Sequence, residues 1–243
     1  MCWNASASVA MVVVGSAAAT LAWSRNEPLA IWGTLAYFTV MEALQATGYT
    51  VVDQCGLPTN RGLTLLSYMH IAFQPLVLNA FAMQIAPQPV PPRLRRWIFV
   101  AAGGATLLML GRLLPWEALG GCRPGVDVMC GTRLCLVSGE WHIGWELPLT
   151  AQVQPLAFIP GFEVQFPAYL VAVFLFPLLY GAWRFVLLHA LAGPVLAMLT
   201  TSDPREMPAV WCLFSIGILL IVLSPKVRYS VMRANRPVSL ART

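Results

Sequence analysis

Apolar residues along this chain gather into seven long runs that are separated by shorter polar segments. A helix needs roughly 20 apolar residues to cross a membrane core about 30 Å thick, because lipid cannot satisfy unpaired backbone groups. The runs therefore predict an all-α protein in a single transmembrane domain, a bundle of seven membrane-spanning helices. The expected spans are 5–24, 29–52, 63–86, 97–114, 166–183, 185–201 and 208–223, and 115–165 is expected to form a long outer loop.

The composition strengthens the membrane interpretation and excludes two other classes of protein. Of the 243 residues, 58% are hydrophobic and 10% are charged, whereas soluble domains have about 45–50% and about 25%. Disordered chains have low hydrophobicity and high charge, the opposite of what is seen here. The net charge of +5 is attributed to basic residues that set the orientation of the helices in the membrane and contact membrane lipids. No nucleic-acid partner is therefore expected.

The distribution of basic residues predicts the orientation of the bundle. Lys and Arg are retained in short loops on the cytoplasmic side. With the N-terminus outside and the C-terminus inside, ten of the 15 basic residues face the cytoplasm, whereas the acidic residues outside the spans, apart from Glu27, lie on the outer side. The expected location is the bacterial inner membrane, with the N-terminus periplasmic or extracellular.

All six cysteines are predicted to lie on the outer, oxidising side, so disulfide bonds are expected. Six cysteines allow 15 pairings, and the sequence does not choose among them. A bridge within the outer loop is expected to involve two of its three cysteines, because this would staple a loop with little core of its own. Zinc binding at 130 and 135 is the weaker alternative, since no second ligand pair is present. The six are Cys2, Cys55, Cys122, Cys130, Cys135 and Cys212.

Polar residues form one stripe on the second predicted span and another on the third. The stripes are Glu42, Gln45, Tyr49 and Ser67, His70, Gln74, and counting from the outer helix ends predicts that Gln45 lies level with His70. A carboxylate near an imidazole in low dielectric can act as a general base, relay a proton or hold a metal. The same polar side chains can instead simply hydrogen-bond helices together.

A second candidate cluster lies in the outer loop, where polar and apolar residues alternate from Glu140 to Leu147. Alternation predicts a half-buried strand, and 133–137 is expected to supply the other arm of a hairpin. If this loop folds back over the bundle, two imidazoles and two carboxylates converge and could bind zinc or iron. These four groups are Glu42, His70, His142 and Glu146.

Four short stretches are similar to an uncharacterised family of small seven-helix bacterial membrane proteins whose chains begin Met-Cys-Trp. The stretches are Met1–Asn4, Met41–Gln45, His70–Pro75 and Gly139–Trp145. The resemblance implies a membrane fold and nothing about activity.

The leading hypothesis from the sequence is a membrane-embedded, metal-dependent enzyme that acts on a lipid or another apolar small molecule. Glu42, His70 and Glu146 would be the catalytic residues, and His142 would join them in binding a divalent metal, zinc or iron. The alternatives are a transporter, channel or proton-coupled carrier, and an accessory subunit of a larger membrane complex. Neither the substrate nor any oligomeric partner can be identified from the sequence.

Overall fold

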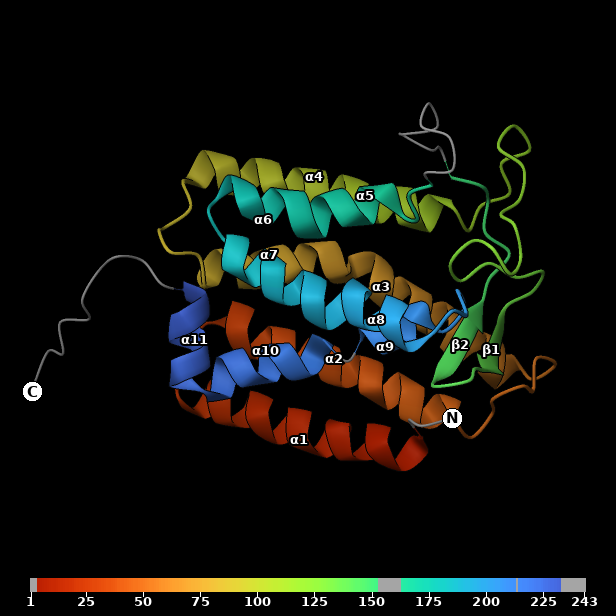
Figure 1. Ribbon diagram of the computed structural model, residues 1–243, viewed down its shortest axis with the longest axis horizontal. Helices are drawn as coiled ribbons and strands as arrows, with labels where there is room; N and C mark the ends of the chain where they lie inside the picture. Colours follow the sequence, from red (N-terminus) through yellow and green to blue (C-terminus); the bar gives the residue numbers. More distant parts are fainter. Residues whose placement is uncertain (1–3, 153–162, 213, 233–243) are drawn as a thin grey trace, which may run out of the picture.

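In a computed structural model of the protein, residues 4–152, 163–212 and 214–232 are described. The first half of the chain forms four long helices: α1 (Ala5–Ser24), α2 (Leu29–Gly48), α3 (Pro58–Gln84) and α4 (Pro92–Gly111). The second half continues as α5 (Pro167–Leu170), η1 (Val171–Leu175), α6 (Phe176–Leu179), α7 (Trp183–Ala190), η2 (Leu191–Val195), α8 (Leu196–Thr200), α9 (Met207–Trp211), α10 (Phe214–Leu223) and α11 (Pro225–Met232). The long helices run side by side, and a β-hairpin covers one end of the bundle (Figure 1).

The helical segments follow the seven apolar runs, so the all-α prediction is confirmed. Among the described residues, four segments are long and apolar enough to cross a membrane: Ala5–Ser24, Pro58–Gln84, Pro92–Gly111 and Trp183–Thr200. A fifth candidate combines Met207–Leu223 with Pro225–Val231 across a bend of 104°. Helix α2 is as long as α1, but Glu42 and Gln45 make it less apolar.

The turn between α2 and α3 differs from the sequence expectation. Helix α2 ends at Gly48 rather than at residue 52, and α3 begins at Pro58 rather than at residue 63. Proline is favoured in the first turn of a helix, because its fixed φ suits the helix and its missing N–H is not needed there. The earlier start shifts every residue of α3 deeper into the bundle relative to α2.

Two helical stretches in the second half, Pro167–Leu179 and Trp183–Thr200, contain the π-helical segments η1 and η2. Pro177 lies in α6, two residues after the end of η1 at Leu175, and Pro194 lies within η2. Proline has no N–H to donate to the preceding turn, so the local helix widens instead of keeping its regular hydrogen bonds.

The hairpin consists of β1 (Cys135–Ser138) and β2 (Ile143–Glu146), which pair antiparallel with Leu136 opposite Trp145. The predicted hairpin is therefore confirmed. Its apolar side packs on the end of α2, where a Cβ added to Gly48 would lie 3.0 Å from Cδ1 of Leu136. A side chain at position 48 would therefore require Leu136 to shift by a few tenths of an ångström.

Two disulfides hold the hairpin end together. Cys122 pairs with Cys130, which confirms the bridge expected within the outer loop, and Cys135 pairs with Cys55 in the α2–α3 turn. Cys212 is buried and has a free thiol. Cys2 lies outside the described residues.

Candidate functional site

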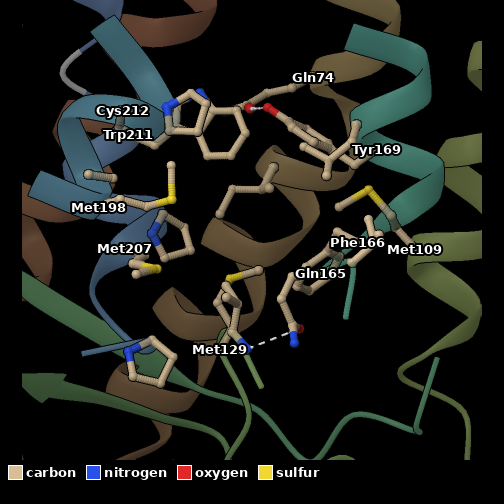
Figure 2. Close-up of a pocket in the computed structure, with 18 of the residues that line it drawn as sticks. Gln74, Met109, Met129, Gln165, Phe166, Tyr169, Met198, Met207, Trp211 and Cys212 are labelled. Atoms are coloured by element: carbon tan, nitrogen blue, oxygen red, sulfur yellow. Dashed lines mark hydrogen bonds between the residues drawn. The ribbon is translucent and has the colours of Figure 1, made fainter. Parts of the chain in front are cut away.

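A cavity of about 580 Å³ lies between α3, the C-terminal end of α4, α5 and the η2–α8–α9 segment. Its volume falls within the range of about 300–1,000 Å³ that is typical of small-molecule sites. Figure 2 shows side chains from these elements facing a common space. Most of the lining is apolar, and four methionines contribute to it: Met109, Met129, Met198 and Met207.

The buried end of the cavity, here called the floor, is formed by polar and aromatic side chains. The hydroxyl of Tyr169 donates a hydrogen bond to Oε1 of Gln74 at 2.6 Å (Figure 2). The indole Nε1 of Trp211 donates to Nε2 of His189 at 3.0 Å. The rings of Tyr169 and Trp211 meet edge to face at 5.6 Å between centroids, so the two hydrogen-bonded pairs form one continuous surface.

The π-helical segment η2 allows this floor to form. A Cβ on Gly193 would collide with Nε1 of Trp211, so the indole fits only because this position lacks a side chain. Pro194 in the same segment also lines the cavity. The irregular helix and its glycine therefore position Trp211 over His189.

The exposed end of the cavity, here called the mouth, is built from two loop segments. Residues 125, 126, 128 and 129 line it and lie inside the loop that the Cys122–Cys130 disulfide closes. The second segment contributes Gln165, whose Oε1 accepts the backbone N–H of Val128 at 3.3 Å. Val126 is 55% exposed and Met198 is 62% exposed, so the cavity runs from an open rim to a buried floor.

Arg123 ties the two segments of the mouth together. Its guanidinium binds Asp127 at 2.7 Å in the disulfide loop and also binds Glu163 in the second segment. Burial alone would raise the pKa of Asp127, but its hydrogen bonds with Arg123 outweigh burial and hold the pKa below its usual range. The carboxylate therefore stays ionised at neutral pH.

Glu42 is buried but does not line this cavity. It faces Ser8 of α1 and Ser215 of α10, beside a much smaller pocket between these helices. Its position fits a role in joining α1, α2 and α10.

His70 pairs with Tyr37 rather than with Gln45. Its Nε2 donates to the carbonyl oxygen of Tyr37 at 2.7 Å, the Tyr37 hydroxyl donates to the carbonyl oxygen of His70, and the two rings stack at 3.8 Å. The early start of α3 explains the difference. His70 lies 12 residues from Pro58 and Tyr37 lies 11 residues from Gly48, so both are about 17 Å from the hairpin end of their helices.

His142 and Glu146 do not form the predicted pair. His142 is buried, and its Nδ1 accepts the backbone N–H of Ile143 at 2.8 Å and lies 3.4 Å from the hydroxyl of Tyr49. Burial lowers the pKa of His142 to about 3. Glu146 instead accepts a hydrogen bond from Arg205 at 2.9 Å.

The predicted metal site is not supported. Glu42, His70, His142 and Glu146 each have different partners, and no group of three or more His, Cys, Asp or Glu side chains in the described part of the chain could hold a metal ion. The deeper position of α3 separates the two candidate ligands on the helices, Glu42 and His70. The hairpin docks on α2, and this gives His142 and Glu146 other partners.

Sequence reasoning missed Glu206, which organises the hairpin turn. Its side chain is completely buried, and Oε2 accepts the backbone N–H groups of Trp141 and His142 at 3.1 and 3.0 Å. The cavity methionines were also missed, because they come from four separate elements and share no sequence spacing. Of the residues singled out from the sequence, Gln74 and Cys212 do line the cavity.

The comparisons with known proteins add a family but no function. A model described as "Family of unknown function (DUF5765)" matches residues 6–232. No curated protein and no solved structure matches the chain.

Proposed function

Since the chain belongs to this family of unknown function, we propose a function from its own geometry: it is a membrane protein that holds an apolar small molecule, such as a lipid, in the cavity between α3, α5 and α9. The observation that carries the proposal is the cavity itself, with its apolar lining and its four methionines. Methionine side chains are flexible and polarizable, and they are used where a surface must adapt to apolar ligands.

The outward-facing side chains support a membrane location. Val13, Leu107 and Leu199 are 64, 70 and 82% exposed. Monomeric soluble proteins rarely expose apolar patches on this scale, whereas lipid would cover these helix faces. We therefore propose that all seven segments span the membrane as one bundle.

The charges at the two ends support an orientation with the hairpin outside and the opposite end in the cytoplasm. Arg25, the arginines at the start of α4, Arg184 and the basic residues of α11 belong to the opposite end. Glu27 is the acid there, and it is neutralised by Arg228 at 2.5 and 2.9 Å. The disulfides of the hairpin end suit an oxidising compartment such as the bacterial periplasm.

A carrier that moves the ligand is the second candidate. One observation favours it: the two spans on either side of the cavity, Pro167–Leu179 and Trp183–Thr200, each contain a π-helical segment at a proline. Such segments are frequent at functional sites. Transfer of a fluorescent lipid between vesicles, catalysed by the reconstituted protein, would distinguish a carrier from a protein that only binds.

Binding can be tested with brominated stearoyl lipid, since bromine quenches nearby tryptophan and Trp211 lies in the cavity. We expect saturable quenching in detergent that is lost in Met207→Trp, because the larger side chain fills the cavity. Met69→Trp is the matched control, since Met69 is 37% exposed on α3 and does not line the cavity. Each variant is compared with its own fluorescence before lipid is added. Equal quenching in both variants would contradict the proposed site.

A further inference from the structure

The chemistry of the cavity floor narrows the class of ligand. The described residues that line the cavity include no lysine and no arginine. Glu163, the one carboxylate among them, lies at the mouth and is bound by Arg123. His189 is neutral, because its Nε2 accepts a hydrogen bond from Trp211. A phosphate or carboxylate buried here would have no cation to pair with, and burying an unpaired charge is very costly.

The floor nevertheless offers one hydrogen-bond donor that a ligand could use. Gln74 is buried, and Tyr169 occupies its Oε1. Among the described residues, the bond from Tyr169 is the one hydrogen bond that the Gln74 amide makes. Its NH₂ group therefore has no acceptor within this part of the chain. A ligand that brings an acceptor to this point therefore gains a hydrogen bond in addition to apolar contact.

We propose that the cavity selects an uncharged, lipid-like molecule that carries a carbonyl group, and that the amide NH₂ of Gln74 binds this carbonyl oxygen at the floor. The inference rests on the proposed function, because it concerns the same cavity. The apolar body of the ligand then lies along the four methionines and leaves through the rim near Met198. Tyr169 is a positioning residue, since its hydroxyl holds Oε1 of Gln74 and thereby orients the NH₂ group.

The test compares three probes of one chain length: a straight-chain methyl ketone, the alkane and the carboxylic acid. Each competes against brominated stearoyl lipid in the tryptophan-quenching assay at about pH 8. We expect the ketone to bind about tenfold more tightly than the alkane, a difference of about 1.4 kcal/mol. The acid is expected to bind more weakly than the ketone, since it would be ionised without a partner.

Variants identify the group responsible for the preference. Gln74→Met should bind the ketone and the alkane equally, because the amide donor is gone while the volume is kept. Gln45→Met is the matched control and should keep the full preference, since Gln45 is a buried amide on α2 that does not line the cavity. Tyr169→Phe should keep a reduced preference for the ketone, because the amide remains but is less well oriented.

The outcomes separate this inference from the proposed function. If all three probes bind alike in the unmodified protein and Met207→Trp blocks them all, the cavity binds apolar molecules but the carbonyl preference is wrong. Tighter binding of the acid than of the ketone also overturns the preference. If no probe competes, or if Met207→Trp has no effect, the proposed function itself fails. Circular dichroism and thermal unfolding of Gln74→Met would show whether a lost preference reflects a lost fold.

Discussion

Asn60 on α3 and Leu136 on β1 exchange two hydrogen bonds across 76 positions of sequence. The Leu136 N–H donates to Oδ1 at 3.0 Å, and Nδ2 donates back to the Leu136 carbonyl at 3.0 Å. Nδ2 also donates to the carbonyl of Val51 at 2.8 Å. One buried side chain thus satisfies backbone groups of both the hairpin and the α2–α3 turn.

We therefore expect Asn60→Leu to destabilise the protein by about 1–3 kcal/mol, since it leaves the buried N–H of Leu136 without a partner. The carbonyls of Leu136 and Val51 still accept hydrogen bonds from the N–H groups of Asp53 and Gln54. Denaturant unfolding in detergent measures the loss. Thr59→Val, an exposed change at the neighbouring position, should alter the free energy of unfolding by less than about 0.5 kcal/mol. Equal stability of Asn60→Leu and the unmodified protein would show that the hairpin is not held at this point.

The two disulfides should contribute unequally to stability. Cys55 and Cys135 are 80 positions apart, whereas Cys122 and Cys130 are 8 apart. Chain-entropy estimates give about 4.5 kcal/mol for the longer loop and about 2.5 kcal/mol for the shorter one. We expect the double variant Cys55→Ser/Cys135→Ser to lose more stability than Cys122→Ser/Cys130→Ser.

Thermal unfolding of the two double variants, each compared with the oxidised protein, tests this order. Peptide mapping without reduction tests the pairing itself, and a peptide that links Cys122 to Cys135 would refute it. The shorter loop forms part of the cavity mouth, so its variant should also weaken lipid quenching, whereas the larger stability loss should come from the other pair.

The parts of the fold that could be predicted depend on local patterns. Apolar runs determine where helices form, and the alternation from Glu140 to Leu147 correctly predicted a strand, because both periods are set by neighbouring residues. The pairing of His70 with Tyr37 at the same depth in the bundle could not be predicted from the sequence, because it depends on the residue at which α3 begins. A shift of a few residues at Pro58 changes every contact between the two helices.

The candidate site was less predictable than the helices. The cavity is bounded by side chains from α2, α3, α4, α5, α7, η2, α8 and α9 and from three loop segments. No local sequence pattern indicates that these elements meet. Glu206 could be recognised in the sequence only as an acid of an outer loop. Its role requires the turn at Gly139, where a Cβ would collide with its carboxylate.

The burial of His142 should make the stability of the hairpin end sensitive to acid. Its pKa is about 3 in the folded protein, compared with an ordinary value of 6.5. As the pH falls below 6.5, the unfolded chain binds a proton that the folded protein does not bind. The free energy of unfolding should therefore decrease between pH 6.5 and 3, with a slope approaching about 1.4 kcal/mol per pH unit.

The variant His142→Asn isolates this contribution, because the amide oxygen can still accept the N–H of Ile143 but does not titrate in this range. Carboxylates such as Asp127 also lose their ion pairs in acid, and they do so in both proteins. The measured quantity is thus the difference between the two stability–pH curves. Parallel curves between pH 6.5 and 4 would show that His142 is not buried as described.

Gly193 offers the sharpest single-residue test of the cavity floor. A Cβ at this position would collide with Nε1 of Trp211, so Gly193→Ala should displace the indole and break its hydrogen bond to His189. Overpacking of this kind costs about 1–3 kcal/mol, although alanine is the better helix former. We expect lower stability, an altered tryptophan emission spectrum and weaker quenching by brominated lipid.

The matched control is Gly103→Ala on α4, where an added Cβ meets no atom within 4 Å. Alanine should be neutral or slightly stabilising there, because it loses less backbone entropy than glycine on forming a helix. If Gly193→Ala behaved like Gly103→Ala in stability, emission and quenching, Trp211 would not be packed against η2. The floor would then not be held in place by this contact, and the orientation of Trp211 toward His189 would need another cause.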